Sequence, residues 1–239
     1  MGITLCIAAT SFSYGQRPTP ADFDFLGVEH NKLLDYVYNE IKNNRADLRN
    51  LPLFGNSLSA YYTSAYSSYP DVRVGAMAIQ KTFASKPQDP GTSLYTPENG
   101  AKMSDEMRNY LDELSSIIFN NTNGFAIKSL TTALEVRINN DQKLNNTELG
   151  ILFSTTSIAK YSADYWATNI NNWKSLPGAH PGILGMNRYI GADVIAGGTV
   201  AAEAWWLNGW PGVGTAWYGG SIIGTAFGAS AFTIIVDLL

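Results

Sequence analysis

The side chains with the greatest potential for chemistry are the two histidines. His30 lies in the segment 27–32, near the acids Glu29 and Asp35, and a histidine beside a carboxylate is suited to general acid–base catalysis. The alternative is a histidine on the surface or at the start of a helix, and we favour that interpretation. His180 lies in a turn rich in proline and glycine, where a role in the loop is expected. The sequence therefore assigns no catalytic residue, although an enzyme with a few scattered functional side chains stays open.

Metal and phosphate sites are not expected either. The chain has two histidines and one cysteine, Cys6, without a zinc-binding spacing. The segment 139–150 lacks the loop glycine and the final glutamate of an EF-hand. The C-terminal glycines follow no expected strand and have no accompanying lysine, as a phosphate-binding loop would require. We predict neither a metal nor a cofactor.

Charge and length restrict the class of protein further. The 239 residues are enough to bury one sizeable core. Charged residues make up 15% of the chain, the net charge is −4, and no cluster of lysines and arginines occurs. A surface for a nucleic-acid backbone needs such a cluster, so we do not expect nucleic acid as a partner.

The N-terminal residues resemble a secretory signal peptide. A short apolar run is followed by Ser13 and Gly15, small residues at the −3 and −1 positions of a cleavage site before Gln16. The basic start of a signal is missing, which a start codon further upstream would explain. The alternative is a buried N-terminal strand or helix. With residues 1–15 removed, the mature chain has no cysteine, and we expect an exported protein of the periplasm, cell envelope or extracellular space.

Hydrophobic periodicity predicts an all-α fold, a helical bundle with a C-terminal glycine-rich helical hairpin. The helical domain spans 16–173, a linker spans 174–188, and the hairpin spans 189–239. Tyrosines at 61–69 are expected in the core, although they offer an alternative stacking surface for a glycan. Helices are expected over residues 25–44, 57–68, 71–84 and 146–173, with a long loop over 85–100. Two more are expected between them, one capped by Ser104 with an apolar stripe to Ile118 and one that passes through residues 127–138.

The tail from 189 to 239 carries the most specific pattern. Small residues recur every four positions, which places them on one helix face and allows a partner helix to approach to backbone distance. The smooth face at Ala192, Ala196, Val200 and Ala204 is the expected partner. The residues of this glycine zipper are Gly212, Ala216, Gly220, Gly224 and Gly228.

Two environments for this hairpin stay open. Residues 213–236 are uncharged, and a helix of that length spans about 36 Å, more than the apolar core of a bilayer at about 30 Å. Glu203 lies within the first arm, and an acid in a bilayer costs about 2.5 kcal/mol or more. The hairpin therefore either enters a membrane or packs within a soluble domain. The aromatics suited to a membrane interface are Trp205, Trp206, Trp210 and Trp217.

The two ends of the chain resemble those of uncharacterised exported proteins of Bacteroidota-type bacteria, through residues 12–16 and the glycine-rich tail. This resemblance implies export and no activity. The tail also resembles the hydrophobic hairpins of some bacteriocins and pore formers, from which Glu203 departs. We expect a non-enzymatic exported protein that self-associates or docks in the cell envelope through its hairpin. The alternative is a membrane-active, pore-forming or bacteriocin-like effector. The implied partners are a second copy, an envelope protein or a membrane.

Overall fold

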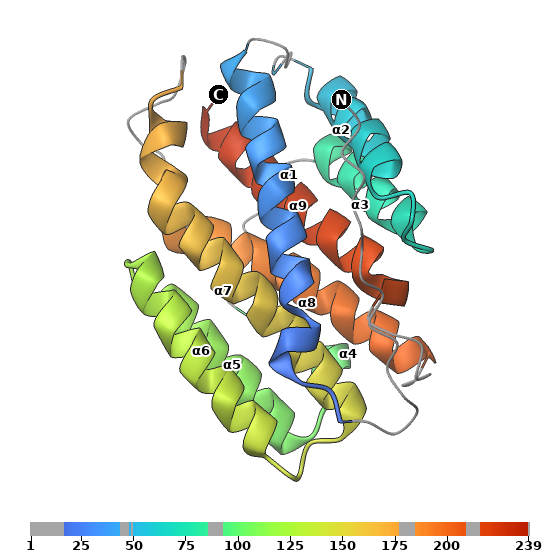
Figure 1. Ribbon diagram of the computed structural model, residues 1–239, viewed down its shortest axis with the longest axis vertical. Helices are drawn as coiled ribbons and strands as arrows, with labels where there is room; N and C mark the ends of the chain where they lie inside the picture. Colours follow the sequence, from blue (N-terminus) through green and yellow to red (C-terminus); the bar gives the residue numbers. More distant parts are fainter. Residues whose placement is uncertain are drawn as a thin grey trace.

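The computed structural model describes residues 17–43, 48, 50–85, 93–176, 185–208 and 216–238. This part of the chain is all-α, as predicted, and contains nine α-helices with no strand (Figure 1). A 3-10 turn at Pro20–Asp22 precedes the helices. These are α1 Asp24–Lys42, α2 Leu51–Ala65, α3 Val72–Ala84, α4 Pro97–Gly100, α5 Asp105–Phe119, α6 Gly124–Asn140, α7 Asn146–Lys174, α8 Met186–Asn208 and α9 Ala216–Leu238.

Side-chain caps explain where several helices begin. Ser104 accepts a hydrogen bond from the amide of Met107 at the start of α5, and Asn123 caps α6. Asn145 and Glu148 form a reciprocal capping box at the start of α7. Asn50 caps α2, so this helix begins at Leu51, before the position 57 expected from periodicity. The polar run between α3 and α5 also contains the short helix α4.

The helices form two flanking pairs around a central group. The pair α2 and α3 lies on one side, and the pair α5 and α6 lies on the opposite side (Figure 1). Between them run α1, the 29-residue helix α7, and the C-terminal helices α8 and α9. One continuous hydrophobic core contains residues from all of these helices, including Trp166 of α7, Ile190 of α8 and Ile235 of α9. The C-terminal helices therefore share their core with the rest of the bundle.

Several predictions concern residues outside the described ranges. The expected signal peptide at 1–15, Trp210 and Gly212 lie there. Ala216 begins α9, but its side chain and those of Trp205, Trp206 and Trp217 are likewise outside the described set. The interfacial role proposed for these tryptophans stays a prediction.

Candidate functional site at the C-terminal helices and the α2–α3 hairpin

The closest helix contact in this region joins α9 to α3. A Cβ added at Gly224 would lie 2.6 Å from the Cα of Gly75, and one added at Gly228 would lie 3.3 Å from the Cα of Ile79. A Cβ added at Gly220 would meet the side-chain oxygen Oδ1 of Asp71 and would lie 3.1 Å from the backbone nitrogen of Val72. Residues four apart on each helix thus face each other along a parallel pair. Backbone approach of this kind maximises dispersion contacts, which offset the intrinsic cost of glycine in a helix.

Polar contacts secure the beginning of the α3–α9 contact. The two carboxylate oxygens of Asp71 accept hydrogen bonds from the amides of Gly220, at 3.0 Å, and Ser221, at 2.6 Å. Burial raises the pKa of Asp71, and the hydrogen bonds from Ser221 and Gly220 oppose that rise. The hydroxyl of Tyr62 donates to the carbonyl of Gly220. Part of α9 is therefore attached to α2 and to the start of α3 by one buried and two partly buried hydrogen bonds.

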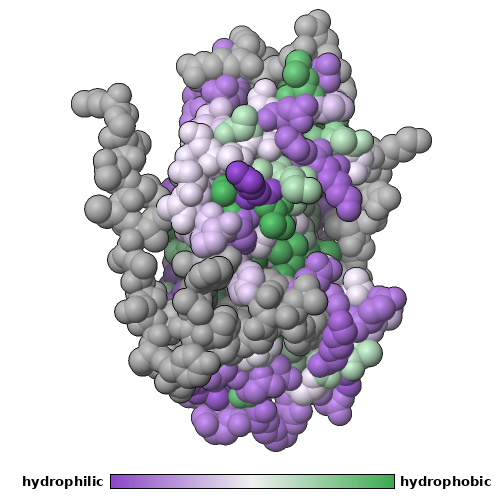
Figure 2. Space-filling model, turned by 90° about the vertical axis from the view of Figure 1, so that its right-hand side faces the viewer, coloured by the Kyte–Doolittle hydropathy of each residue, from purple (hydrophilic) through white to green (hydrophobic). Residues whose placement is uncertain are grey.

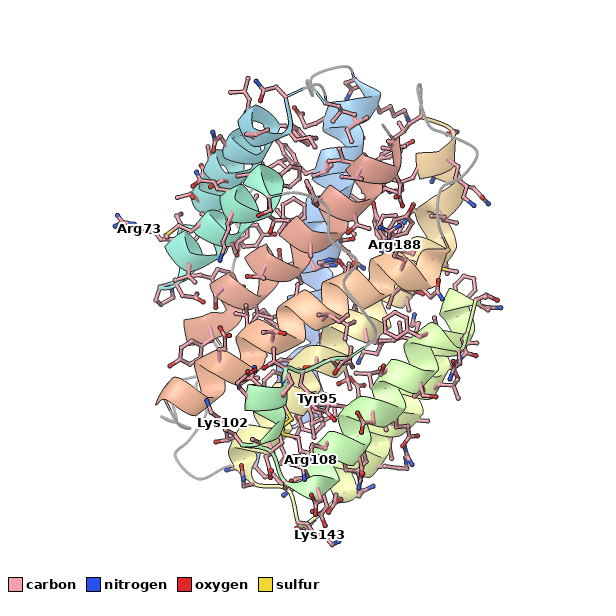
Figure 3. All side chains as sticks on the ribbon, turned by 180° about the vertical axis from the view of Figure 1, so that it is seen from behind. Arg73, Tyr95, Lys102, Arg108, Lys143 and Arg188 are labelled. Atoms are coloured by element: carbon pink, nitrogen blue, oxygen red, sulfur yellow. The ribbon has the colours of Figure 1, made fainter. Side chains whose placement is uncertain are left out.

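An open groove lies along the outer side of α9, between α3 and α8. Figure 3 shows this side, with α9 running between the other two helices. The groove has a volume of about 600 Å³, a size found in small-ligand sites. Its lining from α8 includes Ala192, Ala196 and Val200. The face expected to receive the zipper glycines thus lines the groove, whereas those glycines at 220, 224 and 228 meet α3. Contact between α8 and α9 is made elsewhere, for example by Gly197 and Ala226.

His30 lies in the core of the bundle, which corrects its assignment to the surface or a helix start. Its side chain and that of Asp193 on α8 are both fully buried, with Nε2 and Oδ1 3.1 Å apart. The two atoms do not meet hydrogen-bond geometry, so the contact is a close approach that becomes an ion pair when His30 is protonated. Asp193 accepts a hydrogen bond from Ser162, and His30 Nδ1 lies 3.0 Å from Asn31 Oδ1. This pair joins α1 to α8, and Glu29 and Asp35 are not its partners.

The pKa of His30 reflects two opposing effects. Desolvation by burial lowers it, but the charge of the adjacent Asp193 and the hydrogen bond with Asn31 together raise it more. The net result is a pKa above the usual 6.5. The adjacent Asp193 therefore favours the protonated form of His30 in the folded protein. Both side chains are enclosed in the core, and their contact joins α1 to α8.

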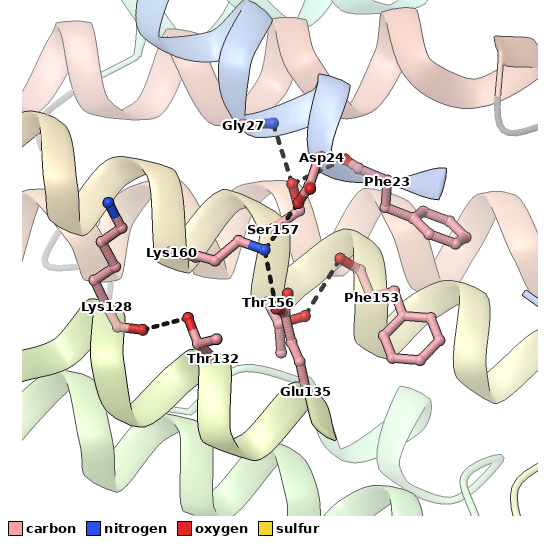
Figure 4. A network of polar contacts seen from close by, with 10 residues as sticks. All are labelled: Phe23, Asp24, Gly27, Lys128, Thr132, Glu135, Phe153, Thr156, Ser157 and Lys160. Carbon is pink, nitrogen blue, oxygen red and sulfur yellow. Dashed lines mark hydrogen bonds and ion pairs between the residues drawn. The ribbon is translucent and has the colours of Figure 1, made fainter. Parts of the chain in front are cut away.

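A second polar network joins α1, α6 and α7 (Figure 4). Lys160 contacts Asp24 at 2.8 Å and Glu135 at 2.9 Å. Ser157 donates to the carbonyl of Phe23 at 2.8 Å. Burial raises the pKa of Glu135, while Lys160 opposes the rise. Both networks include a residue of α1 paired with one from the C-terminal half of the chain, which is why no short motif indicated them.

The outer side of α2 and α3 combines exposed apolar side chains with few charges, whereas α6 exposes apolar side chains among charged ones. Apolar side chains are exposed on it, with Val74 at 55% and Met77 at 67%. Arg73 and Lys81 are the only charged side chains among its exposed residues from 51 to 85. Figure 2 looks onto this side and shows pale and green surface interspersed with purple side chains. We define the α2–α3 face by its outward residues Leu53, Arg73, Val74 and Met77.

The tyrosine run takes little part in this face. Tyr62, Tyr66 and Tyr69 are buried in the core, as the favoured interpretation expected. Tyr61 is 38% exposed and stacks on Tyr36 of α1. The stacking surface considered for a glycan is therefore largely enclosed.

Within the described residues, one helix is long and apolar enough to cross a membrane. It is the stretch Tyr218–Leu238 of α9. Within its apolar 18-residue window, 72% of the residues are buried in the bundle. The described part of the chain contains no group of three or more histidine, cysteine or acidic side chains placed to hold a metal ion.

Comparison with known proteins adds no relative. Neither a protein-family model, nor a curated protein, nor a solved structure matches the chain. Its function is therefore argued from the geometry described above.

Proposed function

We propose that this chain is a non-enzymatic exported protein that docks at the cell envelope by placing its α2–α3 face on an anionic membrane surface. The observation that carries the proposal is the combination of exposed apolar side chains with unpaired positive charge on this face. Export is supported by the resemblance of residues 1–15 to a signal peptide. A non-enzymatic role is supported by the enclosure of His30 and Asp193 in the core.

The apolar part of the argument concerns Leu53, Val74 and Met77. They point outward from the sides of α2 and α3 that are opposite to their buried sides. Side chains that stand out in this way can enter the boundary between lipid headgroups and acyl chains, as those of interfacial helices do. Their neighbours on the outer sides of both helices are mainly serine, threonine, alanine and glutamine, which can approach a membrane without the cost of removing a charge from water.

The charge of the α2–α3 face favours an anionic lipid surface. The whole chain has a net charge of −4, yet no acid is exposed between residues 51 and 85. Arg73 extends away from α3 (Figure 3) and has no ion-pair partner among the described residues. A basic residue near an anionic membrane contributes about 1 kcal/mol of attraction. By contrast, the exposed Val136 on α6 is next to Arg137, which pairs with Glu113.

The sequence predicted docking through the C-terminal hairpin, whereas this proposal places the docking contact on the α2–α3 face. The zipper glycines at 220, 224 and 228 are covered by α3, so a docked bundle would present the outer side of α3 in their place. The hairpin then contributes as support behind the docking face.

A second candidate function is that of a membrane-active effector, which the apolar length of α9 favours. In that case the bundle encloses α9 until delivery, and α9 must leave α3 to insert. The two candidates predict different attachments. Surface docking is released by high salt because it depends on charge, whereas an inserted helix resists both high salt and carbonate.

Fractionation of expressing cells tests the proposal. We expect the wild-type protein in the membrane fraction and its release by high salt. The double variant V74E/M77E should be soluble, and Val136→Glu, a control at a side chain of similar exposure, should behave as the wild type. A wild-type protein found wholly in the soluble fraction would overturn the proposal, as would equal behaviour of the two variants. Retention after carbonate washing would favour the membrane-active effector.

A further inference from the structure

We propose that the core of the bundle holds one bound proton, on Nε2 of His30, and that this proton keeps α8 packed on α1 and α7. The inference goes beyond membrane docking and does not depend on it, because it concerns the interior of the bundle. It rests on which atoms around His30 and Asp193 can donate a hydrogen bond and which can only accept one. Both side chains are fully buried, so each polar atom must find its partner within the protein.

The orientation of Asn31 determines which nitrogen of the neutral His30 ring carries a hydrogen. The amide nitrogen Nδ2 of Asn31 donates to the carbonyl of Tyr161 at 2.9 Å, which leaves its oxygen Oδ1 beside the ring. Nδ1 of His30 lies 3.0 Å from that oxygen. An amide oxygen only accepts hydrogen bonds, so Nδ1 is the donor. In the neutral ring, Nε2 then carries a lone pair and no hydrogen.

The carboxylate of Asp193 is held as an acceptor. Its Oδ2 accepts hydrogen bonds from the hydroxyl of Ser162 and from the indole of Trp166, both on α7, and such bonds favour the charged form of a carboxylate. Its Oδ1 lies 3.1 Å from Nε2 of His30, and neither atom has a hydrogen-bond partner among the described residues. Without an added proton, two buried acceptors therefore face each other. A proton on Nε2 turns this contact into an attraction between opposite charges.

The proton on His30 depends on Asp193. Burial lowers the pKa of His30, and the charge of Asp193 together with the hydrogen bond to Asn31 raises it more. Titratable groups on the helices packed against α1 have partners of their own, namely Tyr66 with Glu29, Lys160 with Asp24, Tyr165 with Trp173, and Asp237 with Tyr189.

Loss of the proton should act on α8 in particular. Asp193 lies in the first half of this helix and keeps its charge, because its bonds from α7 remain. A buried carboxylate without a counter-charge destabilises the packing that encloses it, and a movement of α8 away from α1 and α7 would give Asp193 access to water. We therefore expect α8 to open locally as pH rises through the pKa of His30. Helix α6, which packs on α5 and α7, should stay closed.

Nitrogen NMR of the full chain, labelled in its histidine rings, tests the position of the proton. The chain has two histidines, so His180→Gln leaves the ring signals of His30 alone. We expect this ring to be mainly protonated at pH 6.5, the usual pKa of a histidine, and to titrate at higher pH to the form with hydrogen on Nδ1. A ring that is mainly neutral at pH 6.5 would overturn the inference, as would a neutral form with its hydrogen on Nε2.

Asp193→Asn tests the source of the proton affinity. Removal of the charge should weaken proton binding at His30 by about tenfold or more. Asp164→Asn, on α7, removes a carboxylate from an exposed pair with Lys128 and should leave the titration of His30 unchanged. Equal titration in the wild type and in Asp193→Asn would contradict the assignment. The titration of the wild-type ring decides the question by itself if Asp193→Asn does not fold.

Hydrogen exchange on either side of the titration step measures the effect on α8. After correction for the intrinsic pH dependence of exchange, the protection of α8 relative to α6 should fall by about tenfold or more above the step. In His30→Gln this ratio should not change with pH. A constant ratio in the wild type would overturn the role of the proton in holding α8. Membrane docking has a separate readout, because V74E/M77E should abolish docking and leave both the titration and the exchange ratio unchanged.

Discussion

At the scale of single residues, the ion pair between His30 and Asp193 determines part of the pH dependence of stability. The pKa of His30 is raised in the folded protein, so the folded state binds this proton more tightly than the unfolded state. The resulting stability is fully present below the unfolded pKa of about 6.5 and is lost as pH rises through the folded pKa. Urea denaturation at several pH values should show this decrease for the wild type and a flatter profile for His30→Gln. Parallel profiles would contradict the assignment.

The partner of His30 offers a matched comparison. Asp193→Asn leaves a buried histidine without its counter-charge, and we expect a loss of about 3 kcal/mol or more of unfolding free energy. Asp164→Asn removes the partner of Lys128 in an ion pair whose side chains are 44% and 40% exposed. Such surface pairs contribute about 1 kcal/mol or less. Equal losses in the two variants would show that the buried pair contributes no more than an exposed one.

At the scale of elements, the α3–α9 contact should tolerate added volume unequally along its length. In Gly224→Ala the new Cβ would lie 2.6 Å from the backbone of Gly75, so the helices must separate. We expect a destabilisation of about 2 kcal/mol, although alanine improves helix propensity by about 1 kcal/mol. In Gly228→Ala the closest backbone atom is at 3.3 Å, and the two effects should nearly cancel. Thermal denaturation of both variants measures the difference, and a more stable Gly224→Ala would refute this packing.

The sequence predicted most elements but not their partners. The periodicity of Leu111, Leu114 and Ile118 and the cap at Ser104 were sufficient to locate α5. Glycine spacing at 220, 224 and 228 identified one face of α9, because spacing depends only on the helix itself. It could not identify α3 as the neighbour, since that contact also requires the distant Gly75 and Asp71.

The candidate site was also hard to predict from the sequence, because it depends on contacts between distant segments. His30 and Asp193 form no local motif, and their pairing exists only after α1 and α8 pack. The α2–α3 face requires knowledge of which side of each helix is buried. Its one local signal was the scarcity of charge between residues 51 and 85, which also fits a buried segment.

At the scale of the whole molecule, mild acid should keep the bundle closed. Burial raises the pKa values of Asp71 and Glu135, so their protonation favours the folded state as pH falls through those folded values. His30 acts in the same direction. Binding of a dye that reports exposed apolar surface should therefore stay low between about pH 7 and pH 5, a range that includes the ordinary pKa of a histidine. If mild acid instead raised binding of this dye and also released a second dye trapped in lipid vesicles, the result would indicate acid-triggered exposure of α9.

The central claim is that the α2–α3 face binds an anionic membrane surface, and vesicle flotation of purified protein tests it most directly. We predict that the wild type floats with vesicles of phosphatidylcholine and phosphatidylglycerol, does not float with phosphatidylcholine alone, and is released by salt. Met77→Glu should reduce binding by about tenfold or more, because it places a charge where an apolar side chain enters the interface. Val136→Glu should float as the wild type does. Equal flotation of the two variants, or no binding by the wild type, would contradict the claim.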